Sequence, residues 1–230
     1  MSLFPNTFGI AAGALDAMLA PAPLRIESGI ERLPSGVVRV AVRTDLPNCK
    51  GRMLDWWFKE FDTNQHLLMW HPVDHVEHRG WDAHWRKGQS YVGATIRAVE
   101  SLGDIPPVAA VIRFHDPREA FSPGAYDAAC DRGDASLAVI ARIGFGDDVE
   151  LDAAGDPLQG VMVHVVRDTP FGAVLRSCFL LGPAHGHVVP DAVALGLLQH
   201  CSSEFGYLSR CLPSLYWADP ANRADVPAMW

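Results

Sequence analysis

Apolar residues recur every three or four positions between residues 190 and 216, the spacing that predicts an amphipathic helix. Proline suits the first turn of a helix and cannot continue one, so the helix is expected to begin near Pro190 and to end at Pro213. Because its striped face is mostly apolar, that face is expected to turn toward the interior. The stripe consists of Val193, Leu197, His200, Glu204, Leu208 and Cys211.

Alternation of apolar and polar residues, the period of a half-buried strand, recurs along the middle of the chain. Most connections between these segments are too short for a parallel crossover, so neighbouring strands are expected to pair antiparallel. In one strand the period puts Glu100 on the face shared by Ile96 and Ala98, and its carboxyl group is expected to project inward. The predicted strands cover residues 37–43, 91–100, 107–114, 136–145, 160–167 and 172–181.

Shorter elements complete the predicted layout. They are a short amphipathic helix before Arg25, a short helix over residues 53–60, an irregular wall that ends near Trp85, and loops over residues 115–134 and 146–158. The sum is an α+β fold in one domain over residues 1–230, with a curved antiparallel sheet around the long C-terminal helix and a short N-terminal helical extension. Glu100, His200 and Glu204 would then face one cavity.

The composition excludes several classes of partner. The chain carries 27 acidic and 19 basic residues, a net charge of −8, and no cluster of Lys or Arg. Nucleic acid and anionic membranes require a cationic face, so neither is expected as a partner. No segment approaches the roughly 18 apolar residues of a membrane span, and the N-terminal segment lacks the basic start of a signal peptide. The five cysteines contain no CxxC pair, which favours a reducing, cytoplasmic compartment.

The predicted C-terminal helix carries two candidate metal ligands. His200 and Glu204 are one turn apart, the spacing that lets one helix face hold a cation. A His–Glu hydrogen bond at a partly hydrated helix edge explains the pair equally well. The helix alone therefore does not decide between a metal site and a structural pair.

A second group of candidates lies in the motif WHPVDHVEH at residues 70–78. His71 and His75 are four residues apart, and Asp74 could orient a ring through its second nitrogen. An aromatic-lined turn is the alternative explanation for these histidines. One of these two histidines, together with Glu100, His200 and Glu204, would supply two imidazoles and two carboxylates. This donor set suits Zn²⁺, with Fe²⁺ or Mn²⁺ as alternatives.

Four motifs in this order resemble one known family over roughly residues 50–216. They are WWF at 56–58, WHPVDH at 70–75, YVGATIRAVE at 91–100, and H-x3-E followed by LP-x-LY at 200–216. The chain is similar to the family of 2,4-diacetylphloroglucinol hydrolase and phloretin hydrolase. The resemblance implies a helix-grip (Bet v 1-like) fold and a zinc-dependent hydrolase that cleaves a carbon–carbon bond between an acyl group and a phenolic ring.

The resemblance also implies which residues bind the metal. The family's ligand pattern falls on His75, Glu100, His200 and Glu204, with His71 as the rival for the first position. The chain departs from the family at Leu67, where relatives resemble a tyrosine that contacts substrate.

The leading functional hypothesis is a metal-dependent hydrolase that acts on an aryl ketone or a 1,3-diketone. The ion would polarise the acyl carbonyl and acidify a water, and His71 or His164 would protonate the carbon leaving group. Both faces of the strand that carries His164 are apolar, so the direction of its side chain stays open. The side chains expected to contact a flat aromatic or diketone substrate are Trp57, Leu67, Trp70, His78 and Tyr207.

Two other functions fit the same residues. A non-catalytic helix-grip protein could bind an aromatic or polyketide molecule in the cavity, with the ion structural or absent. A non-haem iron oxygenase is the third hypothesis, because two histidines and a carboxylate with open positions suit Fe²⁺ and O₂. The second glutamate favours hydrolysis. The oligomeric state stays open, with a homodimer as one candidate.

Overall fold

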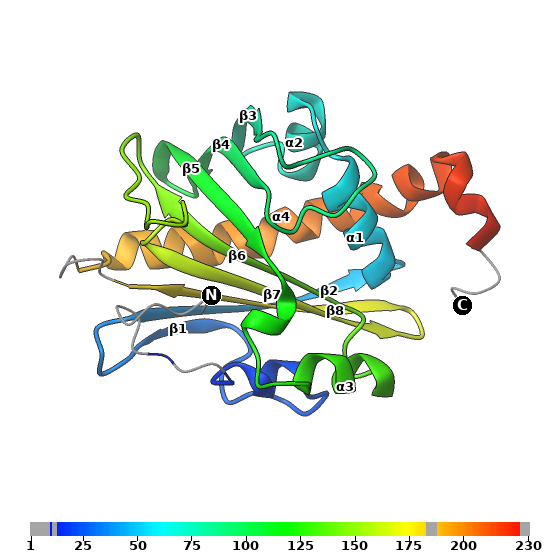
Figure 1. Ribbon diagram of the computed structural model, residues 1–230, viewed down its shortest axis with the longest axis horizontal. Coiled ribbons are helices and arrows are strands. Elements are labelled where there is room, and N and C mark those ends of the chain that lie inside the picture. Colours follow the sequence, from blue (N-terminus) through cyan, green and yellow to red (C-terminus); the bar gives the residue numbers. More distant parts are fainter. Residues whose placement is uncertain (1–9, 11–12, 183–187, 226–230) are drawn as a thin grey trace.

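An eight-stranded antiparallel sheet forms the body of the protein, in the order β1-β2-β8-β7-β6-β5-β4-β3 (Figure 1). The computed structural model describes residues 10, 13–182 and 188–225. The strands are β1 (Gly29–Arg32), β2 (Val38–Pro47), β3 (His75–Trp81), β4 (Thr95–Leu102), β5 (Ile105–His115), β6 (Leu137–Phe145), β7 (Gly160–Thr169) and β8 (Gly172–Leu181). Every neighbouring pair is antiparallel, as the short connections predicted.

One long helix, α4 (Asp191–Ala218), lies across the concave face of this sheet. Its predicted stripe is the face that packs inward, since Leu197, His200, Glu204 and Leu208 are all buried. The predicted α+β helix-grip fold, with a curved antiparallel sheet around a long C-terminal helix, is confirmed. The helix and the inner face of the sheet enclose the larger of the two hydrophobic clusters.

Pro213 does not end this helix, so that expectation was wrong. The helix continues for five residues to Ala218. A proline inside a helix removes the hydrogen bond to the carbonyl four residues earlier, here that of Ser209. The Cys49 thiol donates to this Ser209 oxygen at 3.6 Å and partly replaces the missing bond.

The short helix expected over residues 53–60 is present, and one further helix and an edge strand replace the irregular wall expected after residue 60. The chain forms α1 (Gly51–Glu60), then α2 (Asn64–Trp70), then β3. Thr63 caps α2 by accepting from the His66 amide at 3.1 Å, and the following Pro72 disfavours helical geometry at His71, where the helix stops. Strand β3 is charged and half exposed, as an edge strand often is, and so it lacks the alternation that reveals central strands.

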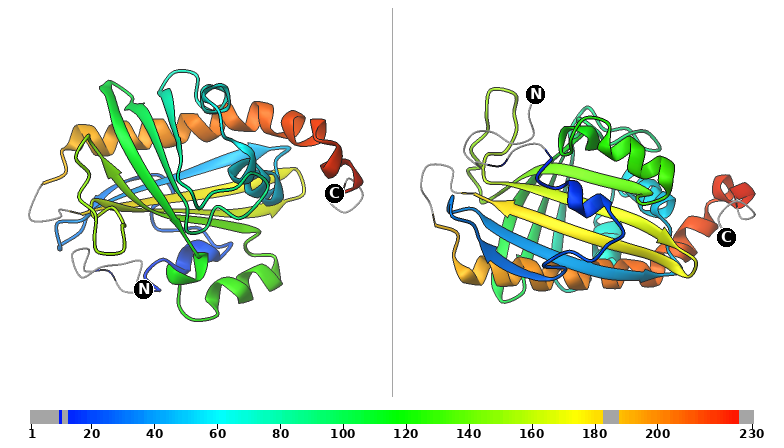
Figure 2. Two further views of the ribbon diagram at one scale, coloured as in Figure 1. Left: turned by 45° about the horizontal axis from the view of Figure 1, so that its top comes forward. Right: turned by 90° about the horizontal axis from the view of Figure 1, so that it is seen from below.

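The opposite face of the sheet is covered by shorter elements (Figure 2). The expected loop over residues 115–134 contains η3 (Pro117–Glu119) and α3 (Ala125–Arg132). The N-terminal helix expected before Arg25 is present only as the 3₁₀ helix η2 (Asp16–Leu19); residues 1–9, 11 and 12 of that prediction lie outside the described part. A further 3₁₀ helix, η5 (Pro220–Asp225), follows α4. Helices η2 and α3 pack with this outer face to form the second hydrophobic cluster.

None of the helices in the described residues combines the length and apolar character needed to cross a membrane. The five cysteines are all free thiols.

Candidate metal centre

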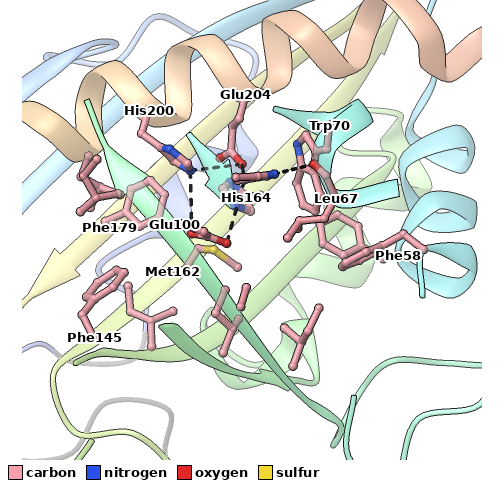
Figure 3. Close-up of a pocket in the computed structure, with 18 of the residues that line it drawn as sticks. Phe58, Leu67, Trp70, Glu100, Phe145, Met162, His164, Phe179, His200 and Glu204 are labelled. Carbon is pink, nitrogen blue, oxygen red and sulfur yellow. Dashed lines mark hydrogen bonds and ion pairs between the residues drawn. The ribbon is translucent and has the colours of Figure 1, made fainter. Parts of the chain in front are cut away.

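Four ionisable side chains from three segments converge between the sheet edge and α4 (Figure 3). His75 opens β3 and lies directly opposite Glu100 on β4 in the antiparallel register. Directly opposite residues project to the same face, so imidazole and carboxyl group both point toward the helix. His200 and Glu204, one turn apart on α4, face them from above.

Each imidazole of this cluster lies at a similar distance from both carboxyl groups. Nε2 of His75 lies 3.9 Å from Oε1 of Glu100 and 3.8 Å from Oε2 of Glu204. Nε2 of His200 lies 3.9 Å from Oε2 of Glu100 and 3.8 Å from Oε2 of Glu204. All four separations are too long for direct hydrogen bonds. The arrangement is therefore not two His–Glu hydrogen-bonded pairs.

Both imidazoles are oriented through their other nitrogen. Nδ1 of His75 lies 2.9 Å from the carbonyl oxygen of Leu67, and as a donor to that oxygen it leaves Nε2 unprotonated. Nδ1 of His200 lies 3.1 Å from Oδ2 of Asp74, which fixes the same tautomer there. Metal-binding histidines are commonly held in this way by a carboxylate or a main-chain carbonyl.

Burial shifts the protonation equilibria of all four groups toward their neutral forms. It raises the pKa of Glu100, and it raises the pKa of Glu204 well above the ordinary value, with the nearby Glu100 carboxylate adding to the effect. Desolvation lowers the pKa of His75 to about 4, and it also lowers the pKa of His200 against the opposing attraction of Glu100. Two buried carboxylates without a positive partner are unfavourable, and a cation would compensate them.

The donor set fits a divalent cation. Ligand atoms around a tetrahedral Zn²⁺ with bonds of about 2.1 Å would be about 3.4 Å apart. The four His–Glu separations are a few tenths of an ångström longer. One ligand atom each of His75, Glu100 and His200 lies within 4.8 Å of the other two, and Glu204 would join them by a side-chain rotation. Two imidazole nitrogens and two carboxylates suit Zn²⁺, and they also suit Fe²⁺ and Mn²⁺.

The cluster forms one end of a cavity between the sheet and α4. The cavity has an empty volume of about 690 Å³, which includes space open to solvent. Apart from the four clustered residues and His164, its lining is apolar and strongly aromatic. The apolar lining residues are Phe58, Phe61, Leu67, Trp70, Ile96, Ala98, Leu102, Ile112, Phe114, Ile143, Phe145, Met162, Phe179 and Leu197.

His71, the expected proton donor or rival ligand, is not among the residues that line this cavity. Its Nδ1 accepts the Asp74 amide at 2.9 Å, and its Nε2 lies 2.7 Å from the Ser203 hydroxyl. The ring stacks on that of His200 with 5.2 Å between centroids. His71, Asp74 and His200 lie close enough together to hold an ion, as do His75, Glu100 and His200, but only the second group lines the cavity.

Three of the expected substrate contacts also lie outside the lining. Trp57 is 1% exposed and packs behind Trp70, with 6.3 Å between ring centroids. His78 packs edge-on against Phe61 instead of facing the cavity, and Tyr207 packs against the ring of His71. Leu67 and Trp70 do line the cavity.

His164 projects inward from β7, the direction that the sequence left open. Its Nδ1 lies 2.8 Å from the Ser177 hydroxyl, and its ring meets Phe205 edge-on at 5.0 Å. Burial lowers its pKa to about 3, so the ring is neutral at physiological pH. Sequence reasoning missed Ser177, which faces His164 across the β7–β8 register; the equal apolarity of both faces of those central strands hid the pairing.

Comparisons with known proteins were consistent with the earlier resemblance. The family model that matches the chain is the DAPG hydrolase PhiG domain, over residues 10–217. Solved structures that are similar include Ara h 8.0201, with 11% identity and a TM-score of 0.48 over 77% of this chain and 99% of that one. Major latex-like protein 151 from Panax ginseng is 13% identical, with a TM-score of 0.47 over 76% of this chain and 96% of that one. Protein Ms6760 from Mycobacterium smegmatis is 12% identical, with a TM-score of 0.43 over 80% of this chain and 96% of that one. No curated protein gave a match.

Proposed function

Because the chain belongs to the DAPG hydrolase PhiG domain family, we propose that it is a hydrolase that holds one divalent cation, zinc in the first instance, and cleaves a carbon–carbon bond next to a carbonyl group. The observation that carries this proposal is the convergence of four buried donors from β3, β4 and α4 at one end of an apolar cavity. His75, Glu100, His200 and Glu204 would hold the ion.

The chain's own residues supply orientation, exclusion of water and a proton. When bound, a divalent cation would polarise the acyl carbonyl and acidify a water molecule. The aromatic and aliphatic walls would exclude other water from the acyl group. In the tautomer whose Nδ1 accepts the Ser177 hydroxyl proton, His164 carries a proton on Nε2.

The bond changes follow from this placement. A water oxygen adds to the acyl carbon, the bond from that carbon to the leaving carbon breaks, and the electron pair goes to the leaving carbon. That pair must be delocalised into a ring or an enolate, because an isolated carbanion is too poor a leaving group. His164 would give its Nε2 proton to the leaving carbon and regain one from the added water. The products are a carboxylic acid and a neutral ketone or arene in which the former leaving carbon carries the added hydrogen.

Metal analysis and anaerobic assays test the proposal. The purified full chain is expected to contain one zinc per chain, and chelation is expected to abolish hydrolysis of acylphenols and 1,3-diketones until Zn²⁺ is restored. Turnover that requires oxygen would instead identify an oxygenase. Undiminished hydrolysis after complete removal of the metal would contradict the proposed role of the ion.

A non-catalytic binder is the second candidate, and the strongly apolar lining of the cavity favours it. A binder has no need of a stoichiometric ion. Full ligand binding with neither bound metal nor turnover would establish this alternative.

A further inference from the structure

We propose that the cavity takes 1,3-diketones with apolar aryl or alkyl substituents, and that it disfavours substrates whose ring carries hydroxyl groups remote from the reacting carbonyl. This inference rests on the proposed hydrolase function, because it names the substrate of the same site. The argument depends on where the polar groups of the cavity lie.

Polar side chains of the described lining gather at one end of the cavity. They are the four candidate ion ligands and His164. Figure 3 shows Glu100, His164, His200 and Glu204 together, while Phe145 lies apart from them. The other walls contain neither hydroxyl, amide nor charged groups among the described residues. A substrate can therefore find hydrogen bonds at its reacting end and few elsewhere.

Main-chain groups do not fill this gap. The lining strands β4, β5, β6, β7 and β8 each pair with a neighbour on both sides, so their amides and carbonyls are used within the sheet. The carbonyl oxygen of Leu67 already accepts the His71 amide at 3.1 Å and faces Nδ1 of His75 at 2.9 Å. The indole N–H of Trp70 has no hydrogen-bond partner among the described residues, but its nitrogen is buried among the surrounding side chains and is not accessible from the cavity.

These hydrogen-bonding groups of the cavity suit a diketone better than a polyhydroxylated ring. Both oxygens of a 1,3-diketone can lie at the polar end of the cavity, whereas several remote hydroxyl groups that each donate and accept would face the apolar walls. A hydroxyl buried without a partner loses its hydration, and each one is expected to weaken binding about tenfold to a hundredfold. The second ketone of a 1,3-diketone also delocalises the electron pair that the broken bond leaves behind, so no phenolic ring is needed for the chemistry.

The reaction balances without a further reactant. Water adds to one ketone carbon, the bond from that carbon to the central carbon breaks, and the pair becomes the enolate of the second ketone. Protonation of the central carbon then gives a methyl ketone or a substituted ketone, and the other product is a carboxylic acid. Neither an oxidant nor a reductant is required.

A matched pair of substrates tests the proposal. We would compare 1-phenylbutane-1,3-dione with its ring-substituted analogue 1-(3,5-dihydroxyphenyl)butane-1,3-dione, on the zinc-loaded full chain. The two compounds share the same reacting diketone and differ only in two remote hydroxyl groups. We expect kcat/KM to be at least tenfold higher for the phenyl compound. Equal or higher kcat/KM for the dihydroxy compound would overturn the proposal.

Binding separates this inference from the hydrolase proposal. Acetophenone and 3,5-dihydroxyacetophenone carry the same difference and lack the second ketone, so their dissociation constants measure cavity preference without the diketone cleavage. If acetophenone binds at least tenfold more tightly while neither diketone is hydrolysed, the hydrolase proposal fails and the apolar preference of the cavity stands. If the dihydroxy compound binds as tightly or more tightly, the preference is refuted whatever the turnover.

A variant of the wall locates the discrimination. Phe145 lines the cavity apart from the clustered ionisable groups (Figure 3), and Phe145→Tyr keeps its ring while adding a hydroxyl group. This variant is expected to reduce the preference for the phenyl diketone several-fold, because the added hydroxyl can pair with a hydroxyl group of the substrate. Phe145→Leu is the apolar control and is expected to keep the preference. An unchanged ratio in a folded Phe145→Tyr protein would contradict the assignment of selectivity to this wall.

Discussion

Replacement of Glu204 by Gln is expected to make the protein less stable than wild type when zinc is bound, but at least as stable as wild type when the metal is absent. Zinc that binds only the folded state stabilises it by about 4 kcal/mol when its free concentration is a thousand times the dissociation constant. For 230 residues, 1 kcal/mol corresponds to roughly 2 °C in Tm, so the wild type should gain about 8 °C. Mutation of a residue that hydrogen-bonds to a metal ligand typically lowers metal affinity 10- to 100-fold. Loss of a ligand itself should therefore lower the affinity for zinc at least about a hundredfold. At the same zinc concentration the gain of the variant should then fall to about 3 °C or less.

The metal-free proteins should differ in the opposite direction. Burial raises the pKa of Glu204 well above its unfolded value, so the stability that its protonated form contributes is fully present below about pH 4.5 and is lost as the pH rises through the raised pKa. A neutral amide avoids that loss. Metal-free Glu204→Gln should therefore be at least as stable as metal-free wild type at pH 7.5, and the difference should shrink toward pH 5.

Differential scanning calorimetry with and without zinc measures both effects. Glu77→Gln is the matched control, because Glu77 lies on β3 close to the site in sequence but its side chain is 54% exposed. The control should show the full wild-type gain. Equal zinc-induced gains in wild type and Glu204→Gln would refute the assignment of Glu204 as a ligand.

Three further substitutions test the roles assigned around the ion. His75→Ala should abolish stoichiometric zinc, whereas His71→Ala should retain it, as counted by mass spectrometry of the purified proteins; the reverse result would exchange their roles. Asp74→Ala should weaken zinc binding 10- to 100-fold, as measured by competition with a chelator. Asp74→Asn should lose less zinc affinity, because its amide oxygen can still accept a hydrogen bond from His200. Equal losses of affinity in the two variants would argue against orientation by this hydrogen bond. His164→Gln should keep full zinc but lower kcat at least about a hundredfold, and unchanged kcat would remove it as the proton donor.

Much of the fold could be predicted because its central elements obey simple periods. The long helix, the inner face of β4 and the direction of Glu100 all followed from spacing alone. The helix stripe also put His200 and Glu204 on the inner face, although spacing could not distinguish a hydrogen-bonded pair from two ligands. That distinction depends on the separations of 3.8 Å between Glu204 and His75 and of 3.9 Å between His200 and Glu100, which join different segments and which no local pattern encodes.

Register was the main quantity that the sequence did not supply. His75 faces Glu100 because β3 and β4 pair in one particular alignment, and that alignment shifts at irregularities between His75 and Glu77 and between His78 and Gly80. A slip by one residue would turn either side chain to the other face of the sheet. Edge strands with bulges carry weak periodicity, so β3 was missed altogether and the ligand in the WHPVDH motif stayed ambiguous between two histidines.

The turn between α2 and β3 explains why that motif contains more polar groups than the ion needs. Pro72 ends the preceding helix, and the Asp74 and Val73 amides donate to Nδ1 of His71, which holds the turn in shape. The carbonyl of Asp74 accepts the Ser101 amide at 2.7 Å, next to Glu100, while its carboxylate orients His200 on the helix. Asp74 therefore ties together all three segments that supply ligands. The site depends on this residue for the relative position of its donors, although Asp74 itself need not touch the ion.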